Sequence, residues 1–499
     1  MEADHQSLLS RASGAWAWSF ANTILGRVGT LGIGIALARL LGPKEFGTYA
    51  VALIALMAVL SFNELGVSLA IVRWPGDPRE IASTVNSIAL TASILLALAT
   101  FFVAGPFAAA MGEPSAAPVV QLLGLTVIIS GGVASPAALM EREFRQKQRM
   151  LVDQVSSWAG ALTSIGCAVA GMGAMSLATG RLVGASAGAI LFVRYSPQPW
   201  RLGLNRRQLR PLLKFGMPLS GASIVVFITG FADQIVVGRM LGAVMLGYYV
   251  LAFNLSQWPI AVFSQPLRNV APATFSRLQH QPEAMRSAFR GLVGLLAAVV
   301  LPVCLLLSGA AGPIIGTVYG HRWAPAAGVL VWLGILAAFK ILYELAYDYL
   351  VVIGASRAIL GLQAVTLASL IPALIAGTAA AGINGAAASQ VVIAAGVMLP
   401  LYVFLFARAG LHPRRLLARV WMPVVIGAGV GLSALAVGRV LHSDLAACAV
   451  DGLVAATALA GLILRDRREL KQLRGGSWDG PVAPSPVAAD PPGVLLNSA

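Results

Sequence analysis

Long apolar runs dominate this sequence and restrict the folds it can adopt. Fourteen of them, each 19 to 29 residues long, are separated by charged residues or Pro/Gly breaks. A run of this length lets an α-helix cross the hydrocarbon core of a bilayer with its backbone hydrogen bonds satisfied internally. The expected spans are 13–41, 48–72, 81–104, 118–140, 151–171, 174–194, 215–241, 244–268, 290–311, 325–353, 358–379, 383–407, 420–439 and 446–464.

The composition excludes several classes of protein. Hydrophobic residues make up 58% of the chain and charged residues 11%, whereas soluble domains average about 45–50% and about 25%. A soluble enzyme, a secreted disulfide scaffold and a nucleic-acid-binding domain are therefore excluded. Because Cys167, Cys304 and Cys448 each lie inside an apolar run, we expect buried thiols and neither a disulfide nor a metal site.

The basic residues predict the orientation of the chain. With the amino terminus in the cytoplasm, 27 of the 35 Lys and Arg residues fall on loops of one side. Cytoplasmic loops carry such an excess. We expect a multi-pass protein of the bacterial inner membrane with both termini cytoplasmic and no cleaved signal peptide.

An internal repeat organises the chain. Residues 39–49 (RLLGPKEFGTY) and 239–249 (RMLGAVMLGYY) match at an offset of 200, with Arg, Leu, Gly, Gly and Tyr in register. Each copy lies at the predicted outer turn between the first two spans of a six-span half. The repeat is parallel, as in transporters whose halves are related by an axis along the membrane normal.

The expected fold is thus an all-α integral membrane protein with two six-helix bundles around a central cleft, plus two C-terminal helices. The predicted domains are a cytoplasmic N-terminus (1–12), an N-terminal bundle (13–194), a basic connector (195–214), a C-terminal bundle (215–407), helices 13 and 14 (408–464) and a disordered cytoplasmic tail (465–499). Part of the connector, 196–214, is interpreted as an amphipathic helix on the inner surface.

Several phrases resemble the Wzx-type polysaccharide flippases of the multidrug/oligolipid/polysaccharide exporter superfamily. They are ARLLGPKEFGTYA at the first repeat, FNELGVSLAIVR (62–73), EREFRQKQ (141–148), FGMPLSGASIVVFITGFADQIVVGRMLG (215–242) and FSRLQHQPE (275–283). The resemblance implies movement of an undecaprenyl-pyrophosphate-linked oligosaccharide from the cytoplasmic to the periplasmic leaflet, through a cationic cavity between two six-helix bundles. It implies no enzymatic activity and no cofactor. A polysaccharide polymerase or export machinery is a possible partner.

Two cations lie in the middle of expected spans. Arg27 is central in 13–41 and Lys340 lies near the centre of 325–353. A charge at that depth is costly, so each needs a compensating role. One role is binding the pyrophosphate, which must exchange its water for charged donors; the alternative is an ion pair that locks helices.

The span around Lys340 carries further polar groups. Lys340, Glu344 and Asp348 are four residues apart and share a helical face, with Tyr343 and Tyr347 beside them. The carboxylates are candidates for binding a coupling proton or Na⁺, and the tyrosines for contacting sugars. The Lys340–Glu344 pair could equally neutralise itself.

Three further charged residues within spans are candidates for a role in transport. Glu64 and Asp233 fall in the flippase-like phrases and are candidates for gating or coupling. Arg181 either lines the exit path or extends outward to the membrane surface.

Two rival functions remain open on the sequence. A drug or cation antiporter of the same superfamily would share the fold, but it should prefer carboxylates to mid-depth cations. A membrane-embedded polysaccharide polymerase would need a long outer loop with catalytic groups, and the outer connections here are short.

Overall fold

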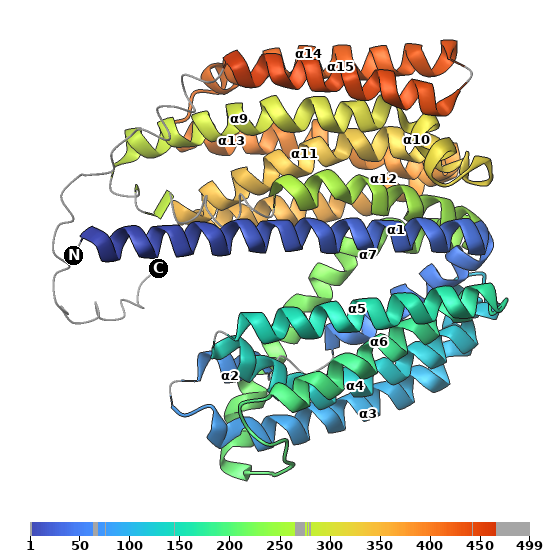
Figure 1. Ribbon diagram of the computed structural model, residues 1–499, viewed down its shortest axis with the longest axis vertical. Helices are drawn as coiled ribbons and strands as arrows, with labels where there is room; N and C mark the ends of the chain where they lie inside the picture. The colour runs from blue at the N-terminus through green and yellow to red at the C-terminus, as the bar shows by residue number, and fades with distance from the viewer. Residues whose placement is uncertain are drawn as a thin grey trace.

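The computed structural model describes residues 2–62, 68–74, 76–143, 145–264, 275–276, 278, 281–441 and 443–465. The side chains of residues 2–31 and of a few further helical positions lie outside this description. Within the described ranges the chain forms helices and no strands, as expected of an all-α membrane protein (Figure 1).

The helices follow the apolar runs closely. The first half contains α1 (Glu2–Phe62), α2 (Ser68–Arg73), α3 (Arg79–Ala110), η2 (Pro114–Ala116), α4 (Ala117–Arg142), α5 (Gln146–Val169) and α6 (Ala174–Tyr195). The rest contains α7 (Arg206–Pro259), η3 (Ile260–Ser264), α9 (Pro282–Gly309), α10 (Ala311–Val318), η4 (His321–Trp323), α11 (Ala326–Val352), α12 (Ser356–Ile393), η5 (Ala394–Met398), α13 (Leu399–Arg408), α14 (Pro413–Val440) and α15 (Asp444–Arg465).

Two of the longest helices are broken at the sequence repeat. Gly42 in α1 has φ 79° and Gly242 in α7 has φ 80°, so each helix is two rods joined by a sharp turn. A side chain at either position would be strained in this conformation, and glycine accommodates it without a steric cost. The shared glycine of the repeat therefore builds the same turn twice.

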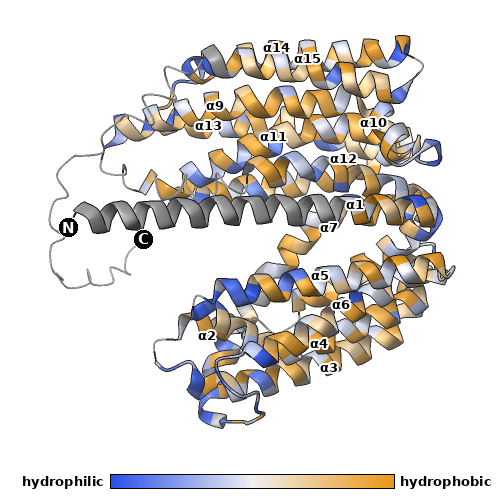
Figure 2. Cartoon of the chain, viewed as in Figure 1, coloured by the Kyte–Doolittle hydropathy of each residue, from blue (hydrophilic) through white to orange (hydrophobic). Residues whose placement is uncertain are grey.

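Ten helical segments are long and apolar enough to cross a membrane, judged by length and composition over the described residues. Figure 2 shows that apolar residues dominate the middle of most helices and that hydrophilic residues gather toward their ends and in the loops. The chain is therefore a multi-pass membrane protein. The count of fourteen crossings stays a prediction.

The helices form two groups (Figure 1). In one group α3, α4, α5 and α6 pack on one another and on part of α1; in the other, α9 and α11 to α15 pack together with part of α7. The groups approach each other where α1 and α7 turn, next to α10. Those turns carry the two copies of the repeat.

The structure contradicts the first part of the expected amphipathic helix at 196–214. Residues 196–205 have no helix, and the helix that begins at Arg206 is the start of α7. Pro197 and Pro199 remove backbone donors and disfavour helix in the residue before each. The Asn86 amide donates to the Arg201 carbonyl at 3.0 Å, so α3 holds this segment in an extended form.

Candidate transport site

The structure describes the side chain of one of the two mid-span cations. The backbone at Arg27 belongs to α1, but the Arg27 side chain lies outside the described part of the structure. Lys340 is half-buried on α11, and its ammonium group interacts electrostatically with Asp233 and Glu344. The Lys340 Nζ atom also lies 5.6 Å from the centroid of the Phe253 ring, within range of a cation–π contact.

Asp233 is the centre of a buried hydrogen-bond network. Its Oδ2 atom accepts from the Tyr249 hydroxyl at 2.7 Å and from the Gln390 amide at 3.2 Å. The Gln390 amide also donates to the Tyr249 oxygen at 2.6 Å, and the Gln234 backbone N–H donates to Asp233 Oδ1 at 2.8 Å. The network joins both rods of α7 to α12 and places a carboxylate within electrostatic reach of Lys340.

Glu344 extends this polar region toward the end of α7. It is half-buried and hydrogen-bonded to the hydroxyl of Ser264 in η3. The structure thus brings together the predicted residues Lys340, Glu344 and Asp233, two from one helix and one from another. One cation and two carboxylates can bind an anionic group or a cation, depending on the protonation of the acids.

The other predicted residues of α11 lie deeper. The Tyr343 ring stacks on Tyr402 with centroids 4.8 Å apart, and its hydroxyl donates to the Ala394 carbonyl at 2.7 Å. Asp348 is buried, whereas Tyr347 is half-buried. In this conformation Tyr343 joins helices and only Tyr347 is partly accessible; their contact with sugars stays a prediction.

Arg181 and Glu64 lie away from this cluster. The exposed Arg181 side chain on α6 interacts electrostatically with Tyr49 of α1. Tyr49 is the repeat counterpart of Tyr249, so one repeat tyrosine contacts a cation and the other a carboxylate. Glu64 is outside the described residues.

A second feature joins the two halves at their turns. The Arg39 guanidinium donates to two carbonyl groups of α10, from Nε to Val318 O at 2.8 Å and from Nη2 to Thr317 O at 2.6 Å. Arg322 returns the contact by donating to the Arg39 carbonyl at 2.6 Å. Guanidinium bonds to carbonyls are charge-assisted, and here they connect segments nearly 280 residues apart.

Trp323 completes this contact on its buried side. The residue is fully buried, and its indole N–H donates to the Ala38 carbonyl at 3.1 Å. Phe46 of α1 and Tyr248 of α7 each meet the Trp323 ring edge to face, with centroids 5.7 and 5.9 Å away. An aromatic centre surrounded by polar contacts is typical of a stable interface.

The repeat glycines permit the close approach of the two turns. A Cβ atom on Gly47 would overlap the carbonyl of Ala243, and one on Gly247 would overlap that of Pro43. The turns therefore interlock reciprocally, as symmetry-related surfaces do. We call the whole contact the clasp, and it comprises Arg39, Phe46, Gly47, Gly247, Tyr248, Thr317, Val318, Arg322 and Trp323.

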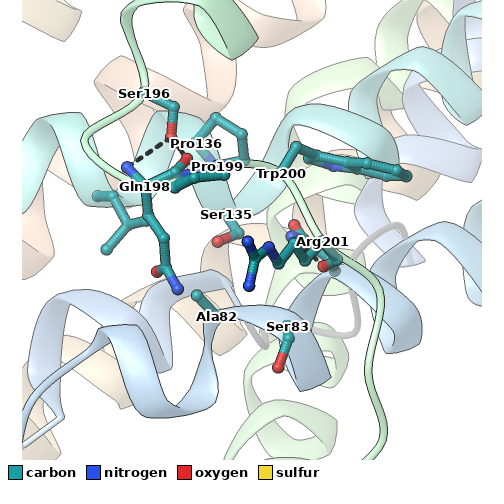
Figure 3. A pocket seen from close by; sticks show the side chains of 11 residues that line it. Ala82, Ser83, Ser135, Pro136, Ser196, Gln198, Pro199, Trp200 and Arg201 are labelled. Carbon is teal, nitrogen blue, oxygen red and sulfur yellow. Dashed lines mark hydrogen bonds between the residues drawn. The ribbon is translucent and has the colours of Figure 1, made fainter.

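Two pockets accompany these features. Figure 3 shows the smaller one, about 10 Å³, between α3, α4 and the extended segment, where Ser135 and Gln198 lie near Arg201. Its size suits one water molecule, which could donate to the unpartnered oxygens of Asn86 and Gln198. It is too small for a sugar or a diphosphate.

The larger pocket, about 470 Å³, lies between the start of α9 and the end of α11 and is lined by Arg286 and Tyr349 among others. This is the opposite end of both helices from the clasp. The Arg286 side chain pairs with Glu283 at 2.8 Å, but Glu283 is 80% exposed, so water weakens that pair. The volume is within the range of small-molecule sites.

Comparison with known proteins decides the family. The polysaccharide biosynthesis protein family matches residues 36–328, more than half of the chain. The chain belongs to the Wzx-type polysaccharide flippase family.

Relatives of this flippase family member include transport proteins of polysaccharide biosynthesis. The succinoglycan biosynthesis transport protein ExoT of Rhizobium meliloti is 27% identical over 64% of this chain and 65% of its own length. The lipopolysaccharide biosynthesis protein WzxC of Escherichia coli is 22% identical over 88% of this chain and 90% of its own length. By these names ExoT is a transport protein and WzxC is a protein of polysaccharide biosynthesis.

Solved structures support the architecture of this chain. The lipid II flippase MurJ in an inward closed conformation superposes with a TM-score of 0.75 at 13% identity, over 90% of this chain and 99% of that one. An inward-facing multidrug transporter of the MATE family gives 0.61 at 15% identity, over 76% and 93%. At such identities the likeness shows the fold alone, that of an all-α membrane protein.

The sequence alone does not single out the clasp or Arg286 as candidate site residues. Arg39 and the glycines were visible as matches within the repeat, which was the available signal for the clasp. Arg322 and Trp323 have no such signal, because their partners lie far away in the sequence. Arg286 likewise gives none, because the pocket it lines also depends on the end of α11.

Proposed function

We propose that this protein translocates an undecaprenyl-pyrophosphate-linked oligosaccharide from the cytoplasmic to the periplasmic leaflet for polysaccharide export. Its membership of the flippase family supports transport in polysaccharide biosynthesis. The lipid carrier, the direction of transport and the transport mechanism all belong to this proposal. The observation that carries it is Lys340, a cation on a membrane-spanning helix beside two acidic groups.

Lys340 can bind a diphosphate when Asp233 and Glu344 are protonated, because two ionised carboxylates would outweigh its single positive charge. A diphosphate entering the bilayer needs donors that replace water. Asp233 is committed to Tyr249 and Gln390, and Glu344 to Ser264, so the ammonium group keeps donor capacity for an incoming anion. Protonation of either acid would free more of that capacity, and we propose these acids, with Asp348 and Glu64, as coupling candidates for a proton or Na⁺.

The clasp supports alternating access as the mechanism. It closes the end of the molecule that the basic loops assign to the periplasm. A structure closed there is the state that admits substrate from the cytoplasm, where the pocket at Arg286 offers a first site for the phosphate. Opening the clasp while the opposite ends approach would then release the oligosaccharide outside.

Complementation tests the proposal. A strain lacking its exopolysaccharide flippase receives the wild type, Arg27→Ala or an empty vector, and both polymer and lipid-linked repeat units are measured. We expect polymer with the wild type, and little polymer with accumulated repeat units with Arg27→Ala. Accumulation with the wild type present would overturn the assignment, whereas normal polymer with Arg27→Ala would remove that residue alone. Export of a cationic drug in place of polymer would support the antiporter.

A further inference from the structure

The last helix, α15, buries a carboxyl group that the proposed transport cycle does not use. Asp451 is 2% exposed, and neither of its carboxylate oxygens has a hydrogen-bond partner among the described residues. The helix packs against α9, α10 and α14. Asp451 lies seven residues after the start of α15, about 10 Å along the helix and thus within the hydrocarbon core.

An ionised carboxylate is strongly disfavoured in such a place. Charges buried in a membrane are kept only where they are paired or hydrogen-bonded. The neutral acid carries no net charge and can be buried at a much smaller cost. Burial of the Asp451 carboxyl group therefore favours its protonated, neutral form.

No cation compensates Asp451 in the described structure. On its own helix the neighbouring titratable groups are Asp444 and Cys448, neither of which is positive at neutral pH. Asp451 forms no ion pair with any described residue, and α10 contains no charged residue. The titratable groups of α9 are Glu283, Arg286, Arg290 and Cys304, and the charged ones lie within its first nine residues. The titratable groups of α14 are Arg414, Arg415, Arg419 and Arg439, which lie within its first nine or its last two residues.

A row of polar groups connects Asp451 to the clasp. Asp444, Cys448 and Asp451 follow a spacing of four and three residues and so share one face of α15. The Asp444 carboxylate lies against Gly316, and the Cys448 Sγ atom is 3.9 Å from the Thr317 hydroxyl. The Thr317 carbonyl is one of the two acceptors of Arg39.

We propose that Asp451 is a proton-binding site, reached along Asp444, Cys448 and Thr317 from the membrane face that carries the clasp. Binding converts the carboxylate to the neutral acid, which lets α15 pack tightly on α9 and α10. Loss of the proton leaves an unpaired charge, loosens this packing and weakens the hold of α10 on Arg39. The proton site rests on the burial of Asp451, and its effect on transport rests on the proposed function.

Infrared spectroscopy of the purified full-length protein, with the spectrum of each variant subtracted from that of the wild type, tests the site directly. At neutral pH we expect the wild type to show a protonated-carboxyl absorption that Asp451→Asn loses and that the control Glu80→Gln, at an exposed carboxylate at the start of α3, retains. Asp451→Leu, which fills the site with an apolar group, should lose the same band and provides a second variant if the asparagine does not fold. A band that is unchanged in both Asp451 variants would overturn the site.

A distance measurement tests the link to the clasp. Spin labels are placed at Lys44→Cys and His321→Cys, exposed positions in different halves, in a protein whose native cysteines are replaced and whose residue 448 is serine. We expect alkaline pH to shift the wild-type distances to longer values and to leave Asp451→Asn unchanged. Identical pH dependence in both would overturn the link. Neither measurement needs a substrate, so both outcomes are independent of whether lipid-linked oligosaccharide is transported.

Discussion

At the scale of single residues, the polar groups of this protein act through a few buried contacts. Lys340, Asp233 and Tyr249 come from two helices and form one connected region in a chain with few charged residues. In a bilayer each such group must find a partner within the protein. Single substitutions here should therefore have large and separable effects.

Replacing Lys340 tests the proposed diphosphate site. We expect Lys340→Ala to reduce polymer export by about 10-fold or more, because a hydrogen bond to a charged group contributes about 1.5–3 kcal/mol. Lys340→Arg should retain much of the activity. The control is Arg357→Ala, an exposed cation at the start of α12, which should be neutral. Equal export by Lys340→Ala and the control would contradict the assignment.

The two repeat tyrosines offer a matched pair for stability. Tyr249→Phe removes a fully buried donor to Asp233 and should lower the free energy of unfolding by about 1–3 kcal/mol. Tyr49→Phe loses a contact to the exposed Arg181 and should cost less. Thermal unfolding in detergent measures both. A larger loss for Tyr49→Phe would show that the Asp233 network adds little.

At the scale of elements, the broken helices α1 and α7 are the parts that meet. Their turns interlock through glycines, and α10 and η4 add hydrogen bonds from one side. Such a contact can open as a unit because it comprises a few residues from short segments. Changes within it should shift the balance between closed and open states.

A methyl group at the interlocked turns should hold the clasp open. In Gly47→Ala and Gly247→Ala the added Cβ overlaps a backbone carbonyl of the other half. We expect several-fold faster labelling of Thr48→Cys, a buried position, by a membrane-impermeant maleimide. Gly105→Ala, with open space around its added Cβ, is the control and should leave the rate unchanged. The same rate in all three variants would show that the turns separate freely.

At the scale of the whole molecule, two groups of helices and one clasp define an asymmetric transporter. The clasp lies at one end, and the pocket lined by Arg286 lies at the other end of α9 and α11. Which end faces the cytoplasm decides the side of the membrane from which this state admits substrate. The basic loops predict that the clasp is periplasmic.

Cysteine accessibility in intact cells tests this orientation. Lys44→Cys and Arg322→Cys, exposed positions at the clasp end, should react with an impermeant maleimide added outside. Asp77→Cys and Arg201→Cys, exposed at the other end, should react only after the membrane is permeabilised. The reverse pattern would invert the topology and make this structure the state that is open to the periplasm.

The sequence by itself determined the class of fold, the family and the position of the repeat. Apolar length sets where helices can cross a bilayer, and the matched Gly42 and Gly242 set where two of them turn, since these are local properties of the chain. The mid-span position of Lys340 could also be read directly. Only the tertiary structure decided that Asp233 lies near Lys340, that Tyr343 stacks on Tyr402, and that Arg39 bonds to α10. The extended segment at 196–205 likewise depends on α3. These contacts join residues far apart in the sequence, and no local pattern of apolarity or charge records which helix will be the neighbour.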